Sequence, residues 1–246
     1  MELITTATAP DETARAAQVA VLPVGSFEQH GDHLPLVTDT VVACAIAGAL
    51  ASTYDLFLLP PVTISCSHEH AGWRGTVSIR STTLAAIITD VIVSLDQAGV
   101  GKLVLVNGHG GNYVLSNIVQ EANVGQRRMA LYPGRHDWEA ARLAAGMVSS
   151  SHDDMHAGEI ETSLLLHLCP ELVGGGYRDA DQVADRPHLL MLGMRGYTAS
   201  GVIGQPSLAT ADKGEAVLDS LTGSFAETLR LLQNGEVSAS GPHAST

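Results

Sequence analysis

The sequence has few cysteines, few aromatic side chains and little positive charge. Cys44, Cys66 and Cys169 are the only cysteines in 246 residues, and they lie far apart without a CxxC spacing. A sparse, odd set argues against a disulfide framework and is typical of a protein with reduced thiols. We therefore expect a cytoplasmic location.

Positive charge is scarce in a chain that is acidic overall. There are 13 Lys and Arg against 26 Asp and Glu, and the formal net charge is −13. Without a basic patch, nucleic acid and anionic membrane surfaces are not expected as partners. No basic segment followed by an apolar one begins at Met1, so no signal peptide is predicted. No uncharged apolar run reaches the ~20 residues of a membrane span.

Apolar runs alternate with amphipathic segments through most of the chain. Strands are expected at 18–24, 77–79, 102–107 and 128–132, and in the run 56–62, where Pro60 and Pro61 end the strand early. Helices are expected at 11–15, 40–53, 83–97, 114–125, 136–147, 156–168 and 211–232. This alternation predicts an α/β fold with a mainly parallel sheet and helices on both faces. We expect one catalytic domain over residues 1–234 and a disordered C-terminal tail at 235–246.

Chemically active side chains gather after two of the expected strands. Glu28 and His30 follow the first strand and are two residues apart, so they share a face of an extended segment, and Asp39 begins the next helix. Sites in parallel sheets form at the carboxyl ends of strands, where this loop can meet the one after Asn107. A polar loop with a helix-capping Asp is the alternative.

The loop after Asn107 places His109 among glycines at 108–112. A phosphate-binding turn is the alternative there, but the Lys and Ser/Thr of a P-loop are missing and the spacing is not GxGxxG. Glu161 lies in the first turns of the helix after His156, beside apolar neighbours that suggest an inward face. Favourable charge at a helix start is the alternative, and for Glu159 it stays open.

Glu28, His30, Asp39, His109 and Glu161 together form a mixed nitrogen and oxygen ligand set. It suits Zn²⁺, Mn²⁺ or Fe²⁺, and Asp39 could bridge two ions. Two ions would activate a water and polarise a carbonyl, with Glu161 close to the reaction. His156, outside the ligand set, would act as general acid or base.

A second loop rich in histidine is expected to wall the pocket. It carries His68, Glu69, His70, Trp73 and Arg74. Arg74 could meet a substrate carboxylate or phosphate, and simple packing of Trp73 is the alternative. No role is assigned to His33.

These motifs resemble the creatininase family of metal-dependent amidohydrolases. The matching segments, in family order, are LPVGSFEQHG (22–31), HLP (33–35), TD (38–39), GTVS (75–78), NGHGGN (107–112), HAGEIETS (156–163), GVIG (201–204) and AT (209–210). The resemblance implies a compact α/β fold, a dinuclear metal centre and a homo-oligomer, often a hexamer. It also implies that Glu28, His30, Asp39 and His109 are ligands, with Asp39 bridging. His156 matches the catalytic histidine of the family.

One position departs from creatininase proper, which carries a ligand Glu where this chain has Gly111. The departure argues against creatinine as substrate, and Glu161 becomes the candidate fifth ligand. We therefore expect a hydrolase of a C–N bond in a small amide, cyclic amide or formamide. The Gly-Gly motif also occurs in a formylaminopyrimidine nucleotide deformylase and in a peptidase of the mycofactocin precursor. A peptidase is thus one alternative, and a non-catalytic metal- or nucleotide-binding protein is another.

Overall fold

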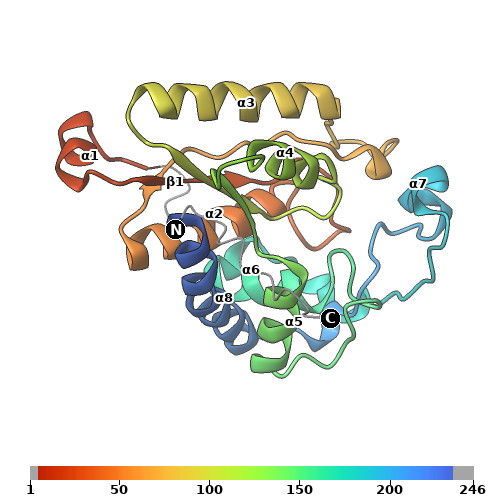
Figure 1. Cartoon of the computed structure of the whole chain (residues 1–246). Coiled ribbons are helices and arrows are strands. Elements are labelled where there is room, and N and C mark those ends of the chain that lie inside the picture. Colours follow the sequence, from red (N-terminus) through yellow and green to blue (C-terminus); the bar gives the residue numbers. More distant parts are fainter. Residues whose placement is uncertain (1–4, 235–246) are drawn as a thin grey trace, which may run out of the picture.

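A single parallel sheet forms the centre of the molecule (Figure 1). The computed structural model describes residues 5–234, and within them four strands are hydrogen-bonded in the order β2-β1-β3-β4. The strands are β1 (Val19–Val24), β2 (Phe57–Leu58), β3 (Lys102–Asn107) and β4 (Met129–Tyr132). The helices are α1 (Ala9–Arg15), α2 (Thr38–Tyr54), α3 (Ser81–Gln97), α4 (Val114–Ala122), α5 (Arg135–Ala144), α6 (Glu159–Leu168), α7 (Leu189–Leu192) and α8 (Ala211–Gln233). The predicted tail at 235–246 lies outside the described residues.

Helices cover both faces of the sheet, because successive strand side chains point in opposite directions. On β1, Val19 and Val21 pack in one apolar cluster with α2, α6 and α8. Ala20 and Leu22 pack in the other cluster, with α3 and α4. Figure 1 shows these two helical layers on either side of the strands. The predicted α/β class, parallel sheet and two-sided helical cover are confirmed.

The predicted early end of the strand in the run 56–62 is confirmed. Only β2 forms there, since Pro60 and Pro61 lack the N–H groups that a ladder needs, and Val62 returns to pair with Val24. The strand at 77–79 is wrong. That segment bonds loop backbone instead, with Val77 N–H donating to the Phe27 carbonyl.

The sheet register brings the two polar loops together. Val24, the last residue of β1, lies beside Asn107, the last residue of β3, so both loops leave the same edge. The start of α2 packs against this edge at Gly108, where an added Cβ would lie 2.3 Å from the Asp39 carbonyl oxygen. Glycine is therefore required there, and the close approach places Asp39 between the loops.

The structure shows no helix within residues 5–234 that is both long and apolar enough to cross a bilayer.

Candidate metal centre

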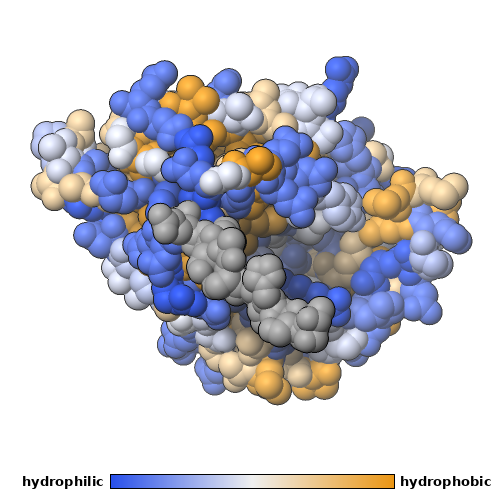
Figure 2. All heavy atoms as spheres, in the orientation of Figure 1, coloured by the Kyte–Doolittle hydropathy of each residue, from blue (hydrophilic) through white to orange (hydrophobic). Residues whose placement is uncertain are grey.

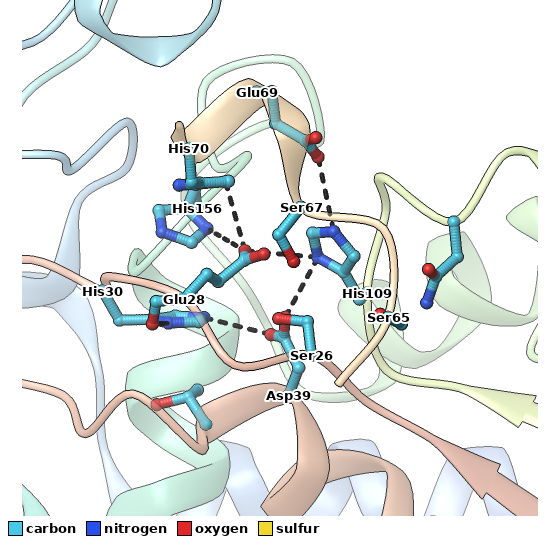
Figure 3. Close-up of polar contacts among 12 residues, drawn as sticks. Ser26, Glu28, His30, Asp39, Ser65, Ser67, Glu69, His70, His109 and His156 are labelled. Atoms are coloured by element: carbon cyan, nitrogen blue, oxygen red, sulfur yellow. Dashed lines mark hydrogen bonds and ion pairs between the residues drawn. The ribbon is translucent and has the colours of Figure 1, made fainter. Parts of the chain in front are cut away.

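Asp39 lies between two histidines at the carboxyl edge of the sheet (Figure 3). Its Oδ1 is 3.0 Å from His30 Nε2, and its Oδ2 is 3.0 Å from His109 Nδ1. Ser26 Oγ donates a hydrogen bond of 2.6 Å to Oδ2 and fixes the carboxylate. Each oxygen thus faces a different imidazole, which is the arrangement that a bridging ligand needs.

Two more carboxylates approach the same point. Glu28 is fully buried, with Oε1 3.1 Å from His70 Nε2 and 3.2 Å from His109 Nδ1. Neither of its oxygens has a hydrogen-bond partner among the residues that the structure describes. Glu161 Oε2 accepts the Ala157 N–H at 2.6 Å and lies 4.0 Å from His30 Nε2. Buried carboxylates without hydrogen-bond donors need a cation as partner.

Three imidazoles each have one ring nitrogen against a backbone carbonyl oxygen. The pairs are His30 Nδ1 with Glu28 O at 3.0 Å, His109 Nε2 with Cys66 O at 2.9 Å, and His156 Nε2 with Gln29 O at 2.7 Å. A carbonyl oxygen only accepts, so each of these nitrogens carries a hydrogen. The other nitrogen of each ring faces the carboxylates, and it is the nitrogen that can ligate a metal ion once it carries no proton.

The donor set fits a metal ion. Ligand atoms lie within 4.8 Å of one another in three overlapping groups, which are Glu28–Asp39–His109, His30–Asp39–Glu161 and Glu28–His30–His156. Nitrogen and oxygen donors without thiolate suit Zn²⁺, Mn²⁺ or Fe²⁺.

Two ionisable groups at this centre have shifted pKa values. Burial alone would lower the pKa of His30, but the Asp39 carboxylate outweighs it and raises this pKa to about 9. Burial raises the pKa of Glu161 to about 8. Both shifts favour the protonated form of the side chain.

His156 is held neutral beside these groups. Burial, followed by the nearby His30 and His70, holds its pKa well below the usual value. Its Nε2–H is donated to the Gln29 carbonyl, and its Nδ1 lies 3.8 Å from Glu28 Oε1. A neutral imidazole with a lone pair at Nδ1 can accept a proton at this point.

Comparison with known proteins identifies the family. The family model for creatininase, described as creatinine amidohydrolase, matches residues 3–229. A mycofactocin precursor peptide peptidase of Mycolicibacterium smegmatis is 34% identical over 229 residues, covering 87% of this chain and 85% of that protein. The chain belongs to the creatininase family. The creatinine amidohydrolase of Pseudomonas putida is 27% identical over 238 residues, which cover 86% of this chain and 88% of that enzyme.

Solved creatininases share the fold. A mutant creatininase complexed with creatine superposes with a TM-score of 0.78 at 23% identity, covering 94% of this chain and 98% of that one. Other solved creatininases include a Zn-Zn form and a Mn form. The creatininase resemblance predicted from the motifs is confirmed, and with it the reaction class: this chain is a hydrolase of an amide C–N bond.

His70, which was expected only in the wall of the pocket, and Gln29, for which no role was predicted, also belong to the site. His70 is buried beside Glu28, and the Gln29 amide nitrogen lies 2.9 Å from His70 Nδ1 and 3.2 Å from His156 Nε2. The pattern His68-Glu69-His70 indicated a site nearby but did not show which histidine belongs to it. His70 is buried there, whereas His68 is exposed.

Three other residues that the sequence analysis singled out lie outside the cluster of candidate metal ligands. His33 is buried, and its Nε2 donates to the Ala157 carbonyl at 3.1 Å, which joins the loop after β1 to the start of α6. Trp73 packs beneath the Arg195 guanidinium, 4.7 Å from the ring centroid. Arg74 is exposed. The packing alternative for Trp73 is therefore the one that the structure favours.

The two glutamates at the start of α6 differ in an unexpected way. Glu161, whose neighbours suggested the more inward face, has a side chain that is 17% exposed, and Glu159 is fully buried. Glu159 accepts hydrogen bonds from Ser149 and pairs with Lys213, away from the candidate ligands. The apolar neighbours of Glu161 in the sequence therefore did not show which glutamate is buried in the core and which lies at the site.

Proposed function

We propose that this protein is a metal-dependent amidohydrolase that cleaves an amide bond in a short peptide substrate. The observation that carries the proposal is the meeting of three carboxylates with imidazoles that each use one nitrogen on a backbone carbonyl and turn the other toward the carboxylates. The proposed ligands of two divalent ions are Glu28, His30, Asp39, His109 and Glu161. When bound, such ions supply an activated water at neutral pH and polarise the substrate carbonyl.

The protein's own residues divide the work. Asp39 is shared by the two ligand groups, Glu28 and His109 complete one, and His30 and Glu161 complete the other. His156 is the proposed proton-transfer residue: Nδ1 takes a proton from the attacking water and returns it to the leaving nitrogen. Its donation from Nε2 to a backbone carbonyl keeps the ring in the orientation that this requires.

Two cavities support a peptide substrate. One, of about 320 Å³, is lined by His109 and Glu161 and has an apolar wall that includes Trp138, Met155 and Leu164. The other, of about 460 Å³, shares the loop after β3 with the first, and its lining includes Glu69, Gly111, Tyr113, Leu192 and Arg195. A peptide has groups on both sides of its scissile bond and would use both cavities. The 34% identity to a peptide peptidase points the same way.

A small amide, cyclic amide or formamide is the second candidate. The cavity beside Glu161 is large enough alone for a small molecule. The 27% identity to a creatinine amidohydrolase supports it. The choice among Zn²⁺, Mn²⁺ and Fe²⁺, the cytoplasmic location, the single domain over 1–234 and the homo-oligomer remain part of the proposal.

A substrate panel tests the proposal. Metal-free protein is reloaded with Zn²⁺, Mn²⁺ or Fe²⁺ and incubated with short peptides, creatinine and formamides, and products are identified by mass spectrometry. We expect peptide fragments from the reloaded protein and none from Asp39→Ala. If only creatinine or formamides were hydrolysed, the substrate would be a small amide, the second candidate, and not a peptide. Metal-loaded protein that cleaves nothing would contradict the proposal.

A further inference from the structure

The His109 ring is held from two opposite sides. Nδ1 lies 3.2 Å from Glu28 Oε1 and 3.0 Å from Asp39 Oδ2, which are proposed ligand atoms. Nε2 lies 2.9 Å from the Cys66 carbonyl and 3.3 Å from Glu69 Oε1. Figure 3 shows Glu69 on the nitrogen that points away from Glu28 and Asp39. The ring therefore has one side for ligation and another that is supported by acceptors.

Gly111 provides the space that the Glu69 carboxylate occupies. A Cβ at this position would lie 1.8 Å from Glu69 Oε1 and 2.4 Å from His109 Nε2, so any side chain would displace one or both. The Glu69 side chain is only 12% exposed. The Glu69 carboxylate can therefore occupy this space only because residue 111 has no side chain.

The loop that carries Glu69 is tied to the loop that carries His109. Cys66 N–H donates to Asn112 Oδ1 at 3.1 Å, and Asn112 in turn donates to Asn107 Oδ1 at 3.1 Å. The position of the Glu69 carboxylate relative to the ring is therefore fixed by hydrogen bonds between the two loops as well as by its own contact with Nε2.

We propose that Glu69 is a positioning residue that acts on the metal through His109. Glu69 is in none of the ligand groups found within residues 5–234, so it is not placed to ligate. A carboxylate beside the N–H of a ligating imidazole orients the ring and makes its other nitrogen a better donor. Glu69 would thus increase the affinity for the ion held by Glu28, Asp39 and His109. This inference rests on the proposed metal centre.

Glu69→Gln is the decisive variant, because it keeps the size and an acceptor oxygen and removes the charge. Glu121→Gln, on an exposed position of α4, makes the same change in net charge far from the ring. Stepwise Zn²⁺ dissociation constants are measured by competition with a chromophoric chelator. The melting temperature of each metal-free protein reports on folding.

We expect Glu69→Gln to raise one of the Zn²⁺ dissociation constants by ~10–100-fold, with the other and the metal-free melting temperature unchanged. Glu69→Asp, which keeps the charge, should recover part of the affinity, and Glu121→Gln should match the parent. Unchanged Zn²⁺ affinity in Glu69→Gln would contradict the role of Glu69. A loss of affinity that accompanies a lower melting temperature in both Glu69 variants would do the same. Either result would leave the proposed metal centre itself standing. A parent protein that binds no Zn²⁺ would overturn the proposed metal centre, and this role with it.

Discussion

Asp39 connects the two halves of the candidate centre, since its oxygens face His30 and His109 separately. Replacing it with Ala removes the ligand that both proposed ions share. We expect Asp39→Ala to lose bound metal and turnover together, as measured by elemental analysis per chain and by product release. Asp32→Ala, an exposed change in the same loop, is the matched control. An Asp39→Ala protein with full metal content and activity would contradict the ligand assignment.

His156 is predicted to act on protons rather than to hold the metal. His156→Asn should keep the metal content of the parent and lower kcat by ~10²–10⁴-fold, the range for loss of a general acid or base. The structure also allows the opposite assignment, because His156 forms a potential ligand group with Glu28 and His30. Elemental analysis separates the two: loss of an ion in His156→Asn would make it a ligand.

At the scale of elements, the sequence predicted the framework of the site because that framework follows from simple rules. Continuous apolar runs gave β1 and β3, and parallel strands place the loops after them at one edge. The loop containing His70 was expected at the wall of the pocket, but the burial of His70 beside Glu28 could not be predicted, because the path of the loop depends on long-range contacts such as Cys66 with Asn112. The prediction of which α6 glutamate is buried failed for a related reason. Glu159 is buried because its partner, Lys213, comes from α8, which is distant in the sequence.

The contact between α2 and the loop after β3 depends on glycine. Gly108→Ala would put a Cβ 2.3 Å from the Asp39 carbonyl oxygen, whereas an added Cβ at Gly110 meets nothing within 4 Å. We expect Gly108→Ala to destabilise the fold by about 1–3 kcal/mol, the usual cost of overpacking, and to weaken metal binding. Gly110→Ala is the control and should match the parent in denaturant unfolding and in metal titration. Equal behaviour of the two variants would contradict this packing argument.

Glu159, which is fully buried, and Lys213, which is partly buried, join α6 to α8 through an ion pair. Glu159→Ala leaves the N–H groups of residues 148 and 149 without their acceptor and Lys213 with only the Leu208 carbonyl, and should cost about 3–5 kcal/mol of unfolding free energy. The double variant with Lys213→Met should lose less than the sum of the two single variants, as measured by urea unfolding. Additive losses would show that the two residues do not interact.

The same pair predicts a pH dependence. Burial raises the pKa of Glu159, but Lys213 and Ser149 outweigh it and lower this pKa below its ordinary value of 4.5. A lowered pKa gives stability that is present above the ordinary value and is lost as pH falls through the folded value. The stability gap between the parent and Glu159→Gln should therefore narrow below pH 4.5. A gap that widens at low pH would contradict the sign.

At the scale of the whole molecule, α7 stands apart from the sheet and exposes apolar side chains. Leu190 and Met191 are 82% and 84% exposed, and Figure 2 shows the apolar surface at this edge, where Figure 1 places α7. Neighbouring exposed apolar side chains of this kind mark contact surfaces. We therefore predict that α7, whose Leu190 and Met191 also line the cavity of about 460 Å³, lies at an interface of the proposed homo-oligomer.

Charge introduced on α7 should separate the subunits, because desolvating a carboxylate in an apolar contact is unfavourable. We expect the parent to have a mass in solution that is a multiple of its 25.7 kDa chain, and Leu190→Glu/Met191→Glu to be smaller, by light scattering after size exclusion. Leu143→Glu, at an apolar residue of α5 that is 84% exposed, should keep the parent mass. If α7 mediates assembly, only the α7 variant changes mass. A monomeric parent would remove the oligomer from the proposal, and an unchanged α7 variant would place the interface elsewhere.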